Sequence, residues 1–93
     1  LFFGSIKIQQ EGNYIFYTES NDGSLLTVNN LKVVDNNGLH GLQESSGNIY
    51  LKKGTHHLEV CYFQQGGGQE LKVYWKGPGF EKREMTEEDL SGE

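Results

Sequence analysis

Apolar and polar residues alternate with a period of two along most of the chain. This period places successive side chains on opposite faces of a β-strand, whereas a helix needs a period near 3.6. The alternating segments are residues 3–9, 14–18, 26–34, 49–51, 56–63 and 71–75. The pattern predicts an all-β fold in which each strand buries one face, either an antiparallel β-sandwich or a partly closed, jelly-roll-like barrel.

The short connections between these segments predict how the strands pair. Glu11-Gly12 follows the first segment and favours a hairpin with the second. Asn29-Asn30 is expected to form a two-residue turn, because Asn tolerates positive φ. Residues 56–63 and 71–75 are separated by a Gln- and Gly-rich loop, so we expect them to pair as a central hairpin.

Two polar stretches interrupt the alternation. Within residues 35–47, Asp, Asn, Gly and Ser replace most apolar residues, which predicts a long surface loop of the kind that often carries function. Residues 81–93 are expected to form a polar acidic tail, in which Thr86 precedes Asp89 by three positions as in a capping box for one helical turn. At this length, residues 1–93 are predicted to form a single domain.

Composition excludes several classes of partner. The chain has 13 glycines, five tyrosines and five phenylalanines against one proline, which suits short strands joined by tight turns. Its formal net charge of −5 argues against a nucleic-acid partner. No stretch approaches the roughly 20 apolar residues of a membrane span. The chain begins at Leu1 without a leader segment, which we interpret as a mature or excised piece.

Residue types used in catalysis are present, but not in catalytic arrangements. The single cysteine, Cys61, lies within a strand beside Glu59, where a half-buried structural thiol is expected and not a nucleophile. His56 and His57 are adjacent, so they face opposite sides of a strand and cannot chelate one zinc ion. The glycines at 66–68 precede no predicted helix and suit a hairpin tip, not a phosphate-binding loop. The sequence therefore predicts a protein that is not an enzyme.

The connection at residues 19–24 is rich in oxygen donors. Calcium takes about six to eight oxygen ligands, usually with more than one carboxylate. Asp22 would supply one carboxylate, with Glu19 or Asp35 as a second. The alternative is an Asx-turn that only closes the connection, and the residues by themselves favour that alternative.

Five stretches spread over nearly the whole chain resemble, in the right order, the protective-antigen-type module known as the PA14 domain. They are Gly12-Asn13-Tyr14-Ile15-Phe16-Tyr17, Ser20-Asn21-Asp22-Gly23-Ser24, Val33-Val34-Asp35-Asn36-Asn37-Gly38 with His40, Leu51-Lys52-Lys53-Gly54-Thr55-His56, and Leu71-Lys72-Val73-Tyr74-Trp75 before Gly77-Pro78-Gly79. The resemblance implies a jelly-roll fold found in secreted glycosidases, adhesins and toxins, and an extracellular or cell-surface location.

The resemblance also implies a calcium-assisted sugar site. In sugar-binding members of that family, a consecutive Asp-Asp pair joined by a cis peptide holds a calcium ion that contacts sugar hydroxyls. The pair matches Asn21 and Asp22, so one carboxylate has become an amide and we expect weaker calcium binding. The matching hairpin loop, residues 64–69, has no aromatic residue to stack on a sugar. Asn37 stands where the family commonly has an aromatic residue.

The resemblance defines a candidate binding site, with calcium as candidate cofactor at the first two of its residues. Its members are Asn21, Asp22, Asp35, Asn36, Asn37, His40, Gln64 and Gln65. The chain is predicted to be a non-catalytic carbohydrate-binding module of a larger secreted or cell-surface protein. The alternative is a structural or protein-interaction module whose partner is a neighbouring domain. The family pattern also has strands before the segment that matches Leu1, so we expect an open sheet edge that could dock another chain.

Overall fold

A computed structural model describes residues 2–21, 23–37, 42–63 and 71–91 of the chain. Within these ranges it contains nine strands and one short 3-10 turn. The elements are β1 (Phe2–Ile8), β2 (Gly12–Ser20), β3 (Gly23–Val28), β4 (Leu31–Asn36), β5 (Gln43–Leu51), β6 (Gly54–Phe63), β7 (Leu71–Gly77), β8 (Phe80–Glu84), η1 (Glu87–Asp89) and β9 (Leu90–Ser91).

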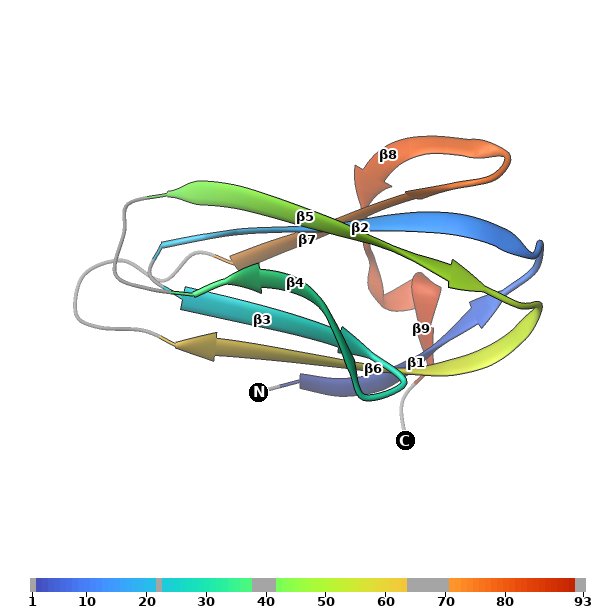
Figure 1. Ribbon diagram of the computed structural model, residues 1–93, viewed down its shortest axis with the longest axis horizontal. Coiled ribbons are helices and arrows are strands. Elements are labelled where there is room, and N and C mark those ends of the chain that lie inside the picture. Colours follow the sequence, from blue (N-terminus) through green and yellow to red (C-terminus); the bar gives the residue numbers. More distant parts are fainter. Residues whose placement is uncertain (1, 22, 38–41, 64–70, 92–93) are drawn as a thin grey trace.

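The strands form two antiparallel sheets that pack face to face (Figure 1). One sheet has the order β4-β3-β6-β1-β9 and the other has the order β5-β2-β7-β8. The predicted all-β sandwich is therefore confirmed, and the described strands do not close into a barrel. The two sheets approach closely along the β4 and β5 edges, where a Cβ on Gly47 would meet the Val33 carbonyl oxygen.

The core lies between the sheets and is built from one face of each strand. Along β2, β3 and β6 the buried positions recur every second residue, as the alternation predicted. The buried apolar side chains are Ile6, Ile8, Tyr14, Phe16, Leu26, Val28, Val34, Leu51, Leu58, Val60 and Trp75.

Two of the three predicted hairpins are wrong. β1 pairs with β6, and β2 pairs with β5 and β7, so the chain crosses from one sheet to the other at residues 9–11. Likewise β6 and β7 lie in different sheets. Alternation shows which face of a strand is buried but not which sheet contains the strand. The β3–β4 hairpin is confirmed: Asn29 and Asn30 have φ of 52° and 69°.

The two polar stretches contain more regular structure than predicted. Residues 43–47 belong to β5, and their polarity reflects an edge strand that pairs only with β2 in the described structure. The tail assignment is also wrong over much of its length, because β8 pairs with β7 and β9 pairs with Ser5 and Ile6 of β1. The capping signal is confirmed: the amide of Thr86 donates to the Asp89 carboxylate at 2.8 Å, at the start of η1.

Candidate functional site

The described residues of the predicted site lie at one end of the sandwich. Asn21 directly follows β2, Asp35 and Asn36 close β4, and Asn37 comes next. The ends of β2, β4 and β6 and the beginnings of β5 and β7 meet at this loop end (Figure 1, left). Asp22, His40, Gln64 and Gln65 lie outside the described residues, as does the peptide bond between Asn21 and Asp22.

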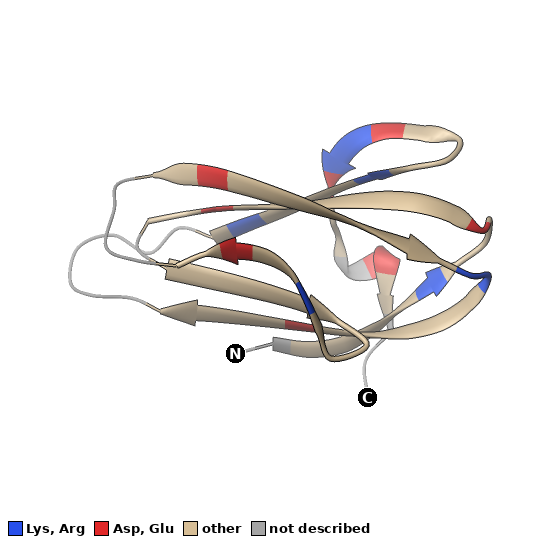
Figure 2. Ribbon diagram, in the orientation of Figure 1, with Lys and Arg blue, Asp and Glu red and all other residues tan. Residues whose placement is uncertain are grey.

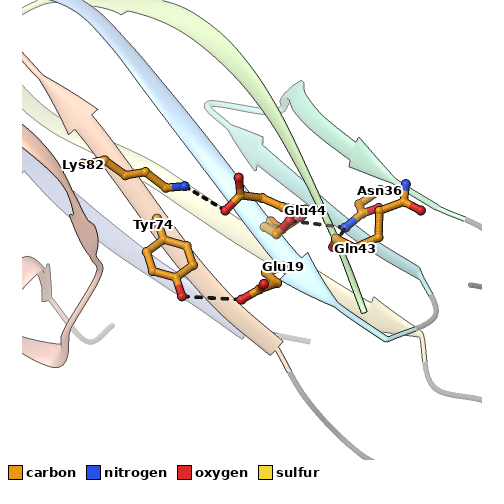
Figure 3. Close-up of polar contacts among 7 residues, drawn as sticks. Glu19, Asn36, Gln43, Glu44, Tyr74 and Lys82 are labelled. Carbon is orange, nitrogen blue, oxygen red and sulfur yellow. Dashed lines mark hydrogen bonds and ion pairs between the residues drawn. The ribbon is translucent and has the colours of Figure 1, made fainter. Parts of the chain in front are cut away.

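The buried side chain of Asn36 links the two sheets by hydrogen bonds. Its side chain is 2% exposed, and its Nδ2 donates to the carbonyl oxygens of Gln43 at 2.8 Å and Thr18 at 3.2 Å. Figure 3 shows this amide reaching from β4 towards Gln43 at the start of β5. We expected Asn36 to face a ligand. Its buried side chain instead joins β4 to β2 and β5, so it positions the neighbouring residues at the loop end.

A layer of buried hydroxyls lies beside this amide. Thr18, Ser20 and Ser24 are fully buried, and Ser24 Oγ donates to Thr18 Oγ1 at 3.0 Å. The hydroxyls of Ser20 and Ser24 are 2.9 Å apart, which ties the end of β2 to the start of β3. Thr18 and Ser20 continue the inward register of Tyr14 and Phe16, but their hydroxyl layer was not predicted from the sequence. Mutual hydrogen bonds meet the cost of burying these polar groups.

Asp35 is exposed and ionised at neutral pH. A hydrogen bond from Lys32 Nζ, 3.1 Å from Oδ2, lowers the pKa of the Asp35 carboxyl, and the backbone amide of Asn37 lowers it further by donating to Oδ1 at 3.1 Å. Such an arrangement is an Asx-turn that fixes the chain after β4. The carboxylate therefore points to its local turn and to Lys32.

The oxygen chemistry of this end suits a hard cation. Asn21 is partly exposed and offers an amide oxygen, and Asp35 offers a carboxylate on the neighbouring β4 connection. Calcium accepts both ligand types. Among the described residues, no three His, Cys, Asp or Glu side chains cluster as a metal group would require. A calcium ion here would therefore need Asp22 and backbone oxygens as further ligands.

The outer face of the β5-β2-β7-β8 sheet carries a second polar arrangement that the sequence did not reveal. Lys82 Nζ lies 2.9 Å from a Glu44 carboxylate oxygen, and the Tyr74 hydroxyl contacts Glu19 at 3.5 Å (Figure 3). The Lys82 ammonium also lies 4.3 Å from the centre of the Tyr17 ring. Figure 2 shows basic and acidic residues interspersed along the strands of both sheets, so neither sheet carries a single sign of charge.

Comparison with known proteins identifies the family. The PA14 domain family matches residues 2–89, which is almost the whole chain. The chain belongs to the PA14 domain family. The resemblance predicted from the sequence is therefore confirmed, and the sandwich described above is the fold of this PA14 domain.

Similar proteins combine this domain with other segments. The anti-sigma-I factor RsgI3 of Acetivibrio thermocellus is 29% identical over 89 residues, which span 94% of this chain and 14% of that protein. A solved anti-sigma factor domain-containing protein is 28% identical with a TM-score of 0.89, over 98% of this chain and 32% of the other. The chain thus spans about a seventh of that curated relative and about a third of that solved structure.

A third solved structure is described as a PA14 sugar-binding domain from an RTX adhesin. It is 26% identical with a TM-score of 0.86, over 98% of this chain and 52% of the other. In the part of this chain that the structure describes, no helix is long and apolar enough to cross a membrane.

Proposed function

We propose that this PA14 domain is a non-catalytic carbohydrate-binding module that uses the loop end of the sandwich. The observation that carries the proposal is the buried Asn36 amide, which holds β4 to β2 and β5 directly beneath the candidate site. A binding site needs its surface residues held in place by a rigid supporting layer. The likeness to a PA14 sugar-binding domain from an RTX adhesin supports the choice of ligand.

Each residue of the candidate site has a proposed role. Asn21, Asp35 and Asn37 offer amide, carboxylate and backbone groups that can exchange hydrogen bonds with sugar hydroxyls. Asp22, His40, Gln64 and Gln65 complete the proposed site from sequence position. Calcium, held by Asn21 and Asp22, would supply a positive centre to which sugar hydroxyls coordinate. Asn21 carries no formal charge, so we expect calcium binding to be weaker than at a pair of carboxylates.

A role without catalysis is part of this proposal, and the setting of the single cysteine supports it. The Cys61 thiol is half-buried within β6, and it lies 3.8 Å from a Glu59 carboxylate oxygen. A half-buried thiol inside a strand is typical of a structural cysteine. We also propose an extracellular or cell-surface location for the parent protein, in keeping with the adhesin that shares this domain.

Calcium titration by calorimetry, with and without simple sugars, tests the proposal. We expect a heat of calcium binding that Asp22→Ala abolishes and that Asn21→Asp increases, because a second carboxylate adds charge to the site. Asn48→Asp adds the same charge on the exposed face of β5 and serves as the matched control. A flat titration of folded protein with every sugar, in the presence and absence of calcium, would contradict the proposal. Thermal melts of each variant separate lost binding from lost folding.

A second candidate function is docking to a neighbouring protein domain. The observation that favours it is an open sheet edge: β9 pairs only with Ser5 and Ile6 of β1, so residues 2–4 have no strand partner on that side in the described structure. Phe3 in this segment is 51% exposed. Open edges and exposed aromatic residues are common at protein interfaces. Replacement Phe3→Ser would weaken such docking and leave calcium and sugar binding unchanged.

A further inference from the structure

A cavity of about 520 Å³ opens at the end of the sandwich opposite the loop end. It lies between the β1–β2 connection, the β7–β8 turn at Pro78 and Gly79, and the η1 segment. These elements are grouped on the right in Figure 1. The volume lies within the range of about 300–1,000 Å³ that is typical of small-molecule sites.

Aromatic rings form one wall of this cavity. Tyr14 and Trp75 are stacked with their ring centres 5.9 Å apart, and Phe80 lies 5.0 Å from Trp75. Tyr14 and Trp75 are only 3% and 5% exposed, so neighbouring groups hold the rings in place. Aromatic faces bind the C–H faces of sugar rings by dispersion and by the hydrophobic effect.

Polar side chains of balanced charge form the rest of the lining. Arg83 binds the Asp89 carboxylate through both of its terminal nitrogens, at 2.9 and 3.2 Å. Lys7 and Glu88 add one further charge of each sign, and the amides of Gln9 and Gln10 add donors and acceptors without charge. The lining therefore has no net charge. This favours a neutral ligand with many hydroxyl groups over an acid or a cation.

Close contacts make the cavity walls rigid. The Tyr14 hydroxyl donates to the Gln10 carbonyl oxygen at 2.5 Å, which ties the β1–β2 connection to β2. A Cβ on Gly12 would lie 2.6 Å from a Pro78 side-chain carbon, and one on Gly77 would lie 2.2 Å from the Tyr14 ring. The backbone around the cavity is therefore held in place, and only side chains such as Arg83 have to shift when a ligand enters.

Trp75 also carries a hydrogen-bond donor that no described residue satisfies. Its indole Nε1 is buried and has no hydrogen-bond partner in the described structure. A buried donor without a partner costs free energy that a ligand hydroxyl can recover. Because Nε1 is covered, a hydroxyl reaches it only when the neighbouring side chains shift. The Arg83 guanidinium, 5.5 Å from the indole centre, belongs to this covering layer.

We propose that this cavity is a second carbohydrate subsite, which binds one neutral pyranose ring against Trp75 and Phe80 without calcium. The inference rests on the proposed function for its ligand class, but it concerns different residues at the other end of the domain. The hydroxyls of the ring bind the amides of Gln9 and Gln10, and the paired charges of Arg83 and Asp89 orient it.

Two-dimensional ¹⁵N NMR tests this subsite, because Trp75 is the single tryptophan and gives a single indole N–H signal. Neutral tetrasaccharides of glucose, mannose, galactose and xylose are titrated in EDTA, with tetragalacturonate as the charged comparison. We expect at least one neutral probe to shift the Trp75 indole signal with a Kd of about 1 mM. The double variant Gln9→Ala, Gln10→Ala should bind that probe about five-fold or more weakly. Asn48→Ala, the matched control on β5, should bind normally.

The outcomes separate the two sites. A saturable indole shift in EDTA that persists in Asp22→Ala supports the cavity subsite, even if the loop end shows no calcium-dependent binding. A calcium-dependent heat without any indole shift in EDTA leaves the loop-end proposal standing and overturns the cavity subsite. Equal binding by wild type and the double glutamine variant, or binding of tetragalacturonate alone, also overturns it.

Discussion

Replacement of Asn36 tests whether the buried amide organises the loop end. Asn36→Ala removes two good hydrogen bonds, at 2.8 and 3.2 Å, and leaves the interior oxygens of Gln43 and Thr18 without this donor. Each such bond contributes about 1 kcal/mol, so we expect a loss of about 2–3 kcal/mol in the free energy of unfolding. For a domain of 93 residues this corresponds to a fall in Tm of about 10–20 °C.

The isosteric variant Asn36→Asp gives the sharper test. At neutral pH the introduced carboxylate cannot donate and faces carbonyl oxygens in a buried setting, so it should destabilise more than alanine does. Burial raises the folded-state pKa of that carboxyl above its unfolded value of about 3.9. Compared with the wild type, this variant is therefore most stable below about pH 4. It loses that stability as the pH rises through the folded-state pKa of the carboxyl.

Urea unfolding followed by Trp75 fluorescence measures these effects. Asn48→Ala is the matched control, because Asn48 lies on the exposed face of β5, so we expect a change below about 0.5 kcal/mol. The reasoning is refuted if Asn36→Ala costs less than about 1 kcal/mol, or if Asn36→Asp equals alanine at pH 7 and gains nothing in acid.

Three further predictions concern other parts of the sandwich. Gly47→Ala should cost about 2 kcal/mol or more in thermal melts, because its Cβ would lie 1.7 Å from the Val33 carbonyl oxygen; a neutral result would contradict the close approach of β4 and β5. Burial raises the pKa of Asp89, but the Thr86 amide and Arg83 lower it more, so the net shift is downward. This carboxylate therefore stabilises the fold above about pH 4. When the pH is lowered below about 4, the free energy of unfolding should fall less for Asp89→Asn than for the wild type. Tyr14→Phe should lose about 1 kcal/mol through its hydroxyl bond, measured by urea unfolding; an unchanged midpoint would refute that contact.

The sequence predicts the strands better than it predicts their partners. Alternation located most buried positions, including Leu26, Val28, Leu58 and Trp75, because each strand of a sandwich has one face in the core. It could not assign strands to sheets, since an inward face looks the same in either sheet. The hairpin proposed at Glu11-Gly12 failed for this reason: the connection crosses between sheets.

The candidate site was predicted by resemblance more than by chemistry. The residues showed an oxygen-rich connection near Asn21, with Asp35 as one candidate for a second carboxylate, but the family supplied its role and its companion at Asn37. The buried role of Asn36 could not be predicted, because a single polar residue at a strand end gives no sign of whether it turns inward. The cavity lined by Trp75 and Phe80 was missed because its residues come from distant segments, which the pairing of β7 with both β2 and β8 helps to bring together.

One strand shows how the two ends of the domain differ physically. From the cavity end to the loop end, the inward residues of β2 are Tyr14, Phe16, Thr18 and Ser20. The aromatic half buries large apolar surface and supplies hydrophobic stabilisation. The hydroxyl half contributes little hydrophobic stabilisation and depends on hydrogen bonds. Because hydrogen bonds are directional, they fix the arrangement of β2, β3 and β4. If the loop end binds a ligand as proposed, hydrogen bonds give it a defined arrangement while the aromatic end stabilises the fold, so substitution of its exposed residues should alter binding without unfolding the domain.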